Sequence, residues 1–595
     1  MSEQVLESEK EVVAREFRFA YHIPTKSKEE PDYHFVKEQV HYKINGEIVI
    51  KPELRLIKDF HRPVFFTSPH LRTHKEKREF EKLENLMRVD VRQSELKETV
   101  ARMTNNFNYH ASLRELCGSP FVYGADIPST LLLRKVYYTD KYPNVVTPRT
   151  VCTFDTETDV VDGIGDIIIT SACFQNEVYV GIQKRKVQGW ADAPEKISNA
   201  INKHLKQFID ERNLKVTFYI ADDEIDLLRD TFKKIHSWRP DFLAIWNMNF
   251  DIPKIIIACD RANVNPAEIF CDPNLPRQFW KFKYKEGATK KVTAAGKEFP
   301  IKPANQWHTL ECTASFYVID AMCCYRRIRG GAELPSYSLD AILTKELNLT
   351  KLRIPEAEKF KKLEWHRFMQ RNMIFDYIAY GLFDSYSMLL LDEKTKDLSR
   401  TLAYLADFTN FEDYASQTKR LRDNFYLFGL ESLGIVIGSL GPKKKDKKSK
   451  PELAYDDEVI DYNAGDDGED SGMIEDVTLD RRNWVVTLRA FMSVLGQNLI
   501  MEDSSLQTLI RAFVYDSDVV SSYPNCTLVA NVSKRTTRKE IISIGDVPER
   551  VFRMQNLNFI FGLTNASEYT QTMFGFPTFS ELNQQFKLHK ATVNL

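Results

Sequence analysis

The sequence lacks the features that mark secreted, membrane-spanning and zinc-binding chains. It has no run of about eighteen apolar residues, and its polar start, MSEQVLESEKEVV, has neither the basic nor the apolar segment of a signal peptide. The nine cysteines include no C-x-x-C pair, so the sequence predicts neither a disulfide framework nor a zinc ribbon. We therefore expect a cytoplasmic protein that does not bind a membrane.

The chain also has little net charge, because 82 Lys and Arg residues stand against 84 Asp and Glu residues. A uniform positive field that would attract nucleic acid is missing, so any contact with DNA has to come from local basic patches. At roughly 150 residues a domain, a chain of 595 residues is expected to hold about three to five domains.

The pattern along the chain changes near residue 149. Before it, short apolar alternations accompany one long charged pattern, THKEKREFEKLENLMRVDVRQSELKETVARM, which predicts a helix. From VCTFDTETDV onward, the sequence predicts strands in DIIITSACF, EVYVGI and KVTFYIA, and helices in APEKISNAINKHLKQFIDERN and DEIDLLRDTFKKIHSW. We expect a multidomain fold of the α/β and α+β classes.

One segment, residues 441–472, differs from the rest in composition. A basic block, GPKKKDKKSK, precedes an acidic block with few apolar residues, so the segment cannot bury enough surface to offset the entropy lost on ordering. It is either a basic arm for DNA phosphates or a solvated insertion whose two halves neutralise each other.

The candidate chemistry lies in three acidic stretches, of which two follow predicted strands. In TFDTETD, Asp155 and Glu157 stand at i and i+2. On a strand both carboxylates point to one side, where a divalent cation would relieve their repulsion. In AIWNMNFDIPKI, Asn247, Phe250 and Asp251 offer an amide, a stacking face for a base and another oxygen ligand. Solvated strand ends and a polar helix cap are the structural alternatives.

The third stretch, MIFDYIAYGLFDSYSMLLL, has apolar or small residues at helical spacing and predicts a buried helix. Tyr380 and Asp384 stand at i and i+4, one turn apart, so a phenol and a carboxylate can converge on one point. Such a pair also arises by chance on an exposed helix face. The order of the three stretches along the chain favours a joint site.

In that order, the stretches resemble the three exonuclease motifs of family B DNA polymerases. PSYSLDAILTKELNLTKL, between the last two, resembles the linking helix of T-even-type phage members. The resemblance implies an RNase H-like 3′-5′ proofreading exonuclease with two Mg²⁺ ions, for which Mn²⁺ can substitute. It implies metal ligands at Asp155, Glu157, Asp251 and Asp384, a water-positioning phenol at Tyr380, and contacts to the single-stranded 3′ end at Asn247 and Phe250.

A fourth stretch, RAFVYDSDVVSSYPNCTLVA, resembles the first palm motif of the same family. That resemblance implies that Asp518 binds both metal ions of a polymerase site and that Ser521 and Tyr523 contact the incoming nucleotide. Asp516, two residues earlier on the same face of the predicted strand, is a rival carboxylate. A plain strand that ends in an SSYP turn is the structural alternative.

The other elements of a family B polymerase site do not appear after Asn525. The sequence there has neither the finger-helix pattern of Lys, Asn and Tyr-Gly nor an Asp-Thr-Asp hairpin, and its last part, RVFRMQNLNFIFGLTNASEYTQTMFGFPTFSELNQQF, is helical in pattern. One carboxylate cannot hold two Mg²⁺ ions in a phosphoryl-transfer geometry. We therefore expect a second polypeptide that carries the rest of the palm, the fingers and the thumb.

The function implied is that of one half of a split phage DNA polymerase. The chain would bind a primer-template and the single-stranded 3′ end in the cytoplasm of an infected host cell, and it would bind dNTP only in the assembled complex. The implied parts are an N-terminal polymerase domain at 1–148, the exonuclease domain at 149–400, a connecting segment at 401–500 with a disordered charged insert at 441–476, and a partial palm at 501–595.

Two alternatives to the split polymerase remain. The first is a free-standing 3′-5′ DNA exonuclease with a decayed palm, which is favoured by Ser522 and Asn525, where the family usually has Leu and Ser. The second is a non-catalytic DNA-binding assembly subunit. The four candidate carboxylates and Tyr380 argue against the second.

Overall fold

The structure is a computed structural model, which describes residues 11–25, 30–106, 108, 110–135, 147–162, 165–292, 298–329 and 334–441. Contacts divide the chain into two units, Met1–Asp466 and Asp467–Leu595, and every described residue belongs to the first. The charged insert after residue 441 and the palm-like segment with Asp518, Ser521 and Tyr523 lie outside the described residues. The boundaries expected at residues 148 and 400 stay predictions.

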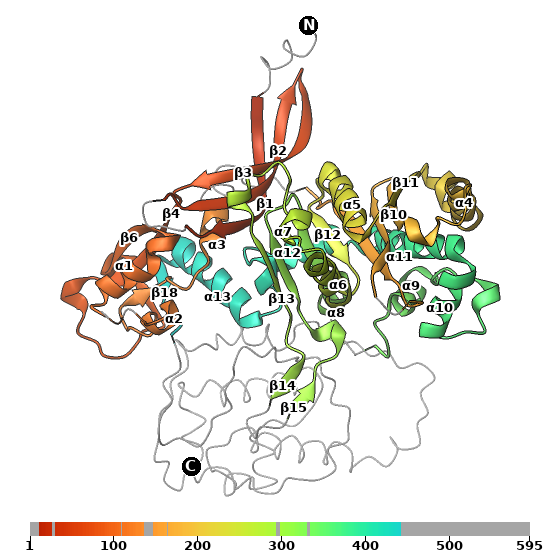
Figure 1. Ribbon diagram of the computed structural model, residues 1–595. Helices are drawn as coiled ribbons and strands as arrows, with labels where there is room; N and C mark the ends of the chain where they lie inside the picture. Colours follow the sequence, from red (N-terminus) through yellow and green to blue (C-terminus); the bar gives the residue numbers. More distant parts are fainter. Residues whose placement is uncertain are drawn as a thin grey trace, which may run out of the picture. The chain divides into compact units, whose positions relative to one another are not determined.

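The largest element is a mixed sheet of eight strands, shown in Figure 1. Neighbours β10 and β11, β8 and β12, and β12 and β17 run parallel, whereas the other described pairs are antiparallel. In spatial order the strands are β11 (Lys215–Ala221), β10 (Glu177–Gln183), β9 (Ile167–Phe174), β8 (Val151–Thr158), β12 (Phe242–Ile245), β17 (Tyr317–Asp320), β16 (Thr309–Cys312) and β13 (Phe282–Lys285).

Helices cover both faces of this sheet, and alternation along β8 shows which side chains meet which helix (Figure 1). The ring of Phe154 packs 5.5 Å from that of Phe232 on one face. On the other face, the Thr153 hydroxyl donates to the carbonyl oxygen of Ser385 at 2.8 Å. The first face carries α5 (Glu224–Trp238) and α6 (Met248–Arg261), and the second carries α4 (Ala193–Arg212) and α11 (Ile374–Thr395).

The expected mixture of strands and helices is confirmed. The strands predicted in DIIITSACF, EVYVGI and KVTFYIA are β9, β10 and β11, and the helices predicted after them are α4 and α5. MIFDYIAYGLFDSYSMLLL lies in α11. Pro253 lies inside α6, which begins at Met248. None of the described helices combines the length and apolar character needed to cross a membrane.

The long charged helix predicted for residues 73–103 is wrong. The segment instead forms β5 (Phe80–Lys82), β6 (Leu86–Arg92) and, only at its end, α1 (Leu96–Met103). β6 pairs antiparallel with β4 (His61–Thr67), and Val89 lies opposite Val64. Alternating apolar residues of LMRVDVR fit a strand once a partner strand is present, and that pairing outweighs the helical preference of the charged residues.

An antiparallel sheet of β1 (Glu11–Ile23), β2 (Tyr33–Ile44) and β3 (Glu47–Lys58) precedes these elements. Its tight turn is Asn45-Gly46, and both residues have positive φ, 51° and 86°, as a two-residue hairpin of this twist requires. The last described strand, β18 (Ile435–Ile437), pairs with β5, so the described chain returns to its N-terminal part.

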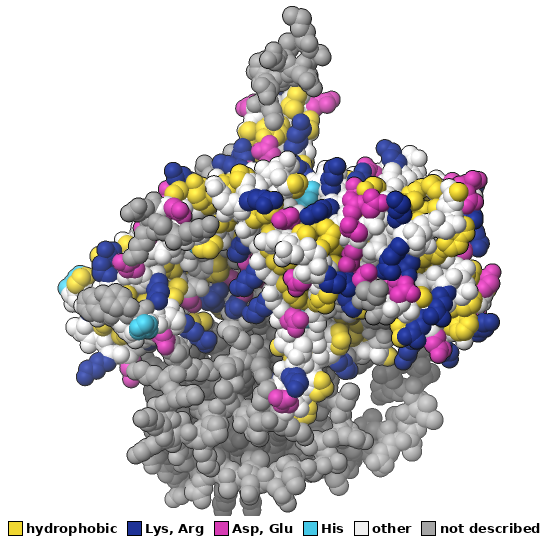
Figure 2. Space-filling model, in the orientation of Figure 1, with side chains coloured by type: hydrophobic (Ala, Val, Ile, Leu, Met, Phe, Trp, Pro, Cys, Tyr) yellow, Lys and Arg dark blue, Asp and Glu magenta, His cyan; other side chains and the backbone are white. Residues whose placement is uncertain are grey.

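The remaining described α-helices and strands are mostly short. They are α2 (Leu113–Leu116), β7 (Val122–Tyr123), α3 (Ser129–Leu133), α7 (Ala267–Phe270), β14 (Lys290–Val292), β15 (Glu298–Pro300), α8 (Ala321–Ile328), α9 (Leu339–Leu347), α10 (Leu363–Asn372), α12 (Leu402–Ala406) and α13 (Gln417–Phe428). Figure 2 shows basic and acidic side chains interspersed over the visible face, in keeping with the small net charge.

Candidate metal centre

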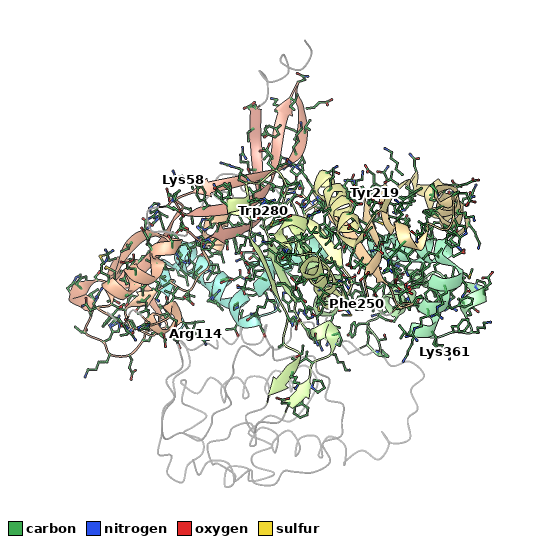
Figure 3. All side chains as sticks on the ribbon, viewed as in Figure 1. Lys58, Arg114, Tyr219, Phe250, Trp280 and Lys361 are labelled. Carbon is green, nitrogen blue, oxygen red and sulfur yellow. The ribbon has the colours of Figure 1, made fainter. Side chains whose placement is uncertain are left out.

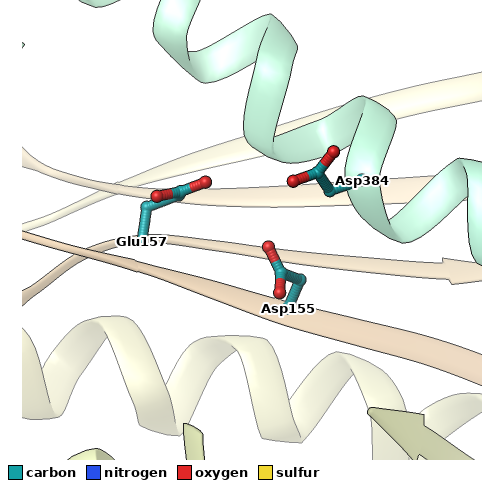
Figure 4. Close-up of side chains that lie close together, drawn as sticks. All are labelled: Asp155, Glu157 and Asp384. Atoms are coloured by element: carbon teal, nitrogen blue, oxygen red, sulfur yellow. The ribbon is translucent and has the colours of Figure 1, made fainter. Parts of the chain in front are cut away.

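Three carboxylates meet between the sheet and α11. Asp155 and Glu157 lie at the end of β8, and Asp384 faces them from α11, as Figure 4 shows. One oxygen from each side chain lies within 4.8 Å of those of the other two. Asp384 is buried, whereas Asp155 and Glu157 are partly exposed. These three side chains can therefore hold a metal ion.

The close approach of α11 to β8 depends on a glycine. A Cβ atom on Gly381 would lie 3.2 Å from Cγ of Glu157, which is tighter than ordinary van der Waals contact. Ser171 on β9 fixes the same helix, because its hydroxyl donates to the carbonyl oxygen of Gly381 at 2.8 Å and lies 2.6 Å from Oγ of Ser385. The helix is thus held where Asp384 faces the strand.

The electrostatics of the three carboxylates favour a cation. Burial raises the pKa of Asp155 well above its usual value, and the charges of Asp251 and Glu157 act in the same direction. Burial, and then the charge of Asp384, raise the pKa of Glu157 to about 8. Oδ1 of Asp384 is buried without a hydrogen-bond partner among the described residues. A divalent cation would relieve the repulsion and supply the missing partner.

Asp251 does not belong to this group of three. It lies in the first turn of α6, where its Oδ1 accepts from the hydroxyl of Thr156 at 2.6 Å and from the backbone N–H of Thr156 at 3.2 Å. Burial raises its pKa to about 7. Its charge acts on Asp155, so it lies beside the centre. Its role as a metal ligand stays a prediction.

The other predicted residues lie on both sides of the sheet. Tyr380 on α11 is buried, one turn before Asp384. Asn247 directly precedes α6, and its carbonyl oxygen accepts from the N–H of Phe250 at 2.9 Å. The side chain of Phe250 is 48% exposed and labelled in Figure 3. Tyr380 therefore joins the three carboxylates, while Asn247 and Phe250 lie at the start of the helix on the opposite face.

Lys351 is a residue of the centre that the sequence did not single out. Its Nζ donates to Oδ2 of Asp384 at 2.6 Å and to the hydroxyl of Tyr380 at 3.2 Å. Burial raises the pKa of Asp384 above its usual value, and the positive charge of Lys351 opposes this rise. Lys351 lies within PSYSLDAILTKELNLTKL, but no spacing rule distinguishes it from Lys345, the other lysine there.

Tyr377 and His366 were also missed. The hydroxyl of Tyr377 donates to Oε2 of Glu157, and Nδ1 of His366 lies 2.9 Å from the same hydroxyl. Gln370 on α10 binds the end of β8 through the carbonyl oxygen of Thr158 at 2.8 Å. Tyr377 lies one turn before Tyr380 on the same helix, and that spacing is the one signal from which it could have been found.

No protein-family model matches this chain, and no curated protein is significantly similar to it.

Proposed function

We propose that this chain is a metal-dependent 3′-5′ exodeoxyribonuclease whose domain is RNase H-like, as in family B DNA polymerases. The observation that carries the proposal is the meeting of Asp155, Glu157 and Asp384 with their oxygens within 4.8 Å of one another. Two segments far apart in the sequence supply these carboxylates, in the order that the exonuclease motifs require. The mixed eight-stranded sheet with helices on both faces supports the same class of domain.

The metal we propose is Mg²⁺, bound as two ions, with Mn²⁺ as a substitute. Asp155, Glu157 and Asp384 would hold the ions, and Asp251 is the further carboxylate beside them. Hard oxygen ligands of this kind suit Mg²⁺. When bound, the ions lower the pKa of the attacking water and stabilise the leaving 3′ oxygen.

The side chains around the carboxylates have separate tasks in this reaction. The hydroxyl of Tyr380 orients the water, and Lys351, which contacts both Tyr380 and Asp384, fixes that hydroxyl and favours the ionised form of Asp384 against the effect of burial. The water gives up a proton to solvent as its oxygen bonds to the phosphorus atom of the last phosphodiester. The bond from phosphorus to the 3′ oxygen breaks, and the 3′ oxygen takes up a proton from solvent. Tyr377 holds Glu157 in place through its hydroxyl.

The DNA contact we propose is at the start of α6. Phe250 exposes an aromatic face on which an unpaired base can stack, and Asn247 beside it offers an amide for hydrogen bonds. The strand would reach the carboxylates from this side of the sheet, because Asp251 follows Phe250 directly and lies beside Asp155. Single-stranded 3′ ends, including the frayed end of a primer-template, are the substrates that fit this path.

The proposal includes a second polypeptide that completes a polymerase site together with Asp518, Ser521 and Tyr523 and that brings dNTP binding with it. On α13, the exposed side chains of Leu421, Phe425 and Phe428 follow one another at helical spacing. A row of large apolar side chains is the kind of surface that a subunit interface covers. The assembly would act in phage DNA replication.

The test of the nuclease uses the variant Asp155→Asn with Glu157→Gln, which keeps the shapes of the side chains and removes two charges. We expect the wild-type chain to shorten a 5′-labelled oligonucleotide from its 3′ end in Mg²⁺ and the variant to be at least about 100-fold slower. Mg²⁺ should also raise the melting temperature of the wild-type chain and not that of the variant.

Asp222→Asn is the matched control, because Asp222 is an exposed carboxylate that pairs with Lys184 at the surface. It should digest DNA like the wild type. Digestion by the double variant at the wild-type rate would contradict the proposal. With all four dNTPs present, the chain alone should still shorten a primer, and template-directed extension would show that no second polypeptide is needed.

A further inference from the structure

A hollow of about 460 Å³ opens beside the metal centre. Lys351 and Tyr380 line it, and both also contact the surroundings of Asp384, so the hollow and the carboxylates share a wall. Its volume is within the range of small-molecule sites, about 300–1,000 Å³, and suits a single nucleotide. The other side chains with polar or aromatic groups in its lining are Asp340, Arg353, Glu358 and Trp365.

The lining offers the groups that a nucleoside needs. Trp365 is half-buried, and the centroid of its ring lies 4.7 Å from that of the Tyr380 ring. This packing holds the indole in place as an aromatic side of the hollow. Arg353 is exposed at the rim, and within the described part of the chain its side chain has no ion-pair partner. A base can stack on the indole, while Arg353 is left to stack on or donate to the base.

Two carboxylates of the hollow can accept hydrogen bonds from a nucleoside. Oδ1 of Asp340 already accepts from the backbone N–H of Lys351 at 2.7 Å, and Glu358 is exposed. Asp340 therefore lies at the Lys351 end with one oxygen already engaged, and both carboxylates are acceptors for hydroxyl or amino groups. Lys351 is a cation in direct contact with Asp384 of the metal centre, so a phosphate group fits at that end of the hollow and the nucleoside at the Trp365 end.

The hollow and the proposed DNA contact lie on different sides of β8. Phe250 is on α6, which covers one face of the sheet, whereas Tyr380 is on α11, which covers the other. A strand that arrives along α6 would be cut at the carboxylates. The released nucleotide then has an open volume on the far side, with an aromatic wall and a cation.

We propose that this hollow binds the deoxynucleoside 5′-monophosphate that the reaction releases, with its base on Trp365, Arg353 beside the base and its phosphate toward Lys351. The inference rests on the exonuclease activity proposed above and adds a product site to it. Product nucleotides would therefore inhibit the nuclease, and Trp365 and Arg353 would set the strength of that inhibition.

The experiment measures inhibition by dAMP of the digestion of a 5′-labelled single-stranded oligonucleotide by the full chain, together with direct binding of dAMP by saturation-transfer NMR without DNA. Trp365→Ala removes one stacking contact with the base, so we expect the inhibition constant of dAMP to rise about 10-fold. Trp365→Phe keeps an aromatic face and should recover most of the inhibition. Arg353→Ala should also raise the inhibition constant of dAMP.

The matched controls lie outside the hollow. Lys361→Ala removes an exposed cation of the neighbouring segment, labelled in Figure 3, and Trp190→Ala removes a partly exposed indole that packs on Phe375. Both should bind dAMP like the wild type. Equal inhibition constants of dAMP for the wild type, Trp365→Ala and Arg353→Ala would contradict the product site. They would not affect the proposed nuclease activity.

Two other outcomes separate this inference from the proposed function. If the wild type digests DNA and millimolar dAMP neither inhibits it nor gives an NMR signal, the hollow is not a product site. If the chain does not digest DNA, the proposed exonuclease activity is wrong, and the hollow cannot be its product site. In that case a dAMP signal that disappears in Trp365→Ala would still support a nucleotide site at this position.

Discussion

His34 on β2 is fully buried, with its Nε2 2.9 Å from the hydroxyl of Ser129 and its ring 5.1 Å from that of His22. Burial lowers the pKa of His34 to about 4, and the charge of His22 acts in the same direction, whereas that of Asp32 opposes it. The folded chain therefore keeps this imidazole neutral at a pH where the unfolded chain, with a pKa near 6.5, would protonate it.

This difference predicts how stability depends on pH. The contribution of His34 is fully present above pH 6.5 and is lost as the pH falls from about 6.5 to about 4, by roughly 3 kcal/mol in the free energy of unfolding. His34→Asn should make the fall over this range shallower in urea unfolding curves measured at several pH values. The exposed His110→Asn is the control. An unchanged slope in His34→Asn would show that other groups produce the pH dependence.

Single residues of the metal centre divide into those that short spacings could find and those that they could not. Asp155 and Glu157 stand two apart on one strand, and Tyr380 and Asp384 stand four apart on one helix, so local geometry already places each pair on one side. Lys351 lies on neither element. It reaches Asp384 only through the packing of the segment after α9 against α11, which no local pattern contains.

At the scale of elements, the contact between α11 and β8 leads to a prediction at Gly381. Alanine favours a helix over glycine by about 1 kcal/mol, so Gly381→Ala should leave the melting temperature equal or higher. Its Cβ would nevertheless push on Cγ of Glu157 from 3.2 Å. We expect a loss of nuclease activity on the order of 10-fold, because small displacements of catalytic groups are costly.

The measurement for Gly381→Ala combines thermal unfolding with the digestion of a 5′-labelled oligonucleotide. Gly189→Ala is the control, since a Cβ there would meet nothing within 4 Å. Wild-type activity in a stable Gly381→Ala chain would show that Glu157 tolerates the shift, or that it is not part of the centre.

β6 is a strand in a segment whose residues favour a helix. Glu and Lys residues in THKEKREFEKLENLMRVDVRQSELKETVARM favour a helix, and only the end of the segment, α1, follows that preference. The strand depends on β4, whose residues lie 19 to 31 positions before their partners in β6. Strand pairing is decided by a partner that is distant in sequence, so local propensity gave the wrong element here while it gave α4 and α5 correctly.

At the scale of the described molecule, Asp241 links the N-terminal sheet to the central one. It is 1% exposed, and Nε of Arg18 on β1 and Nζ of Lys37 on β2 lie 3.4 and 4.0 Å from its oxygens. Burial alone would raise the pKa of Asp241, but these cations, Arg18 most of all, hold it below the usual value. The backbone N–H of Thr150, just before β8, also donates to it at 3.0 Å.

Asp241→Asn should therefore destabilise the chain strongly. The amide keeps the shape of the side chain but removes the anion beside Lys37 and one of the two carboxylates beside Arg18, which also contacts Glu16. Removing one partner from buried ion pairs costs roughly 3–5 kcal/mol in the free energy of unfolding. Asp222→Asn, which removes one partner of an exposed pair with Lys184, should cost less than about 1 kcal/mol. Urea unfolding measures both, and equal stability of the two variants would contradict a structural role for the buried ion pairs.

The sequence by itself determined the three carboxylates, Tyr380, and the strands and helices that carry them, because period and spacing along one element fix which side chains share a face. Only the tertiary structure decided that Lys351 and Tyr377 contact these groups, that Asp251 is engaged by Thr156 beside them, and that residues 86–92 form a strand. Those outcomes depend on contacts between segments far apart in the chain, which form only when the sheets and helices pack together.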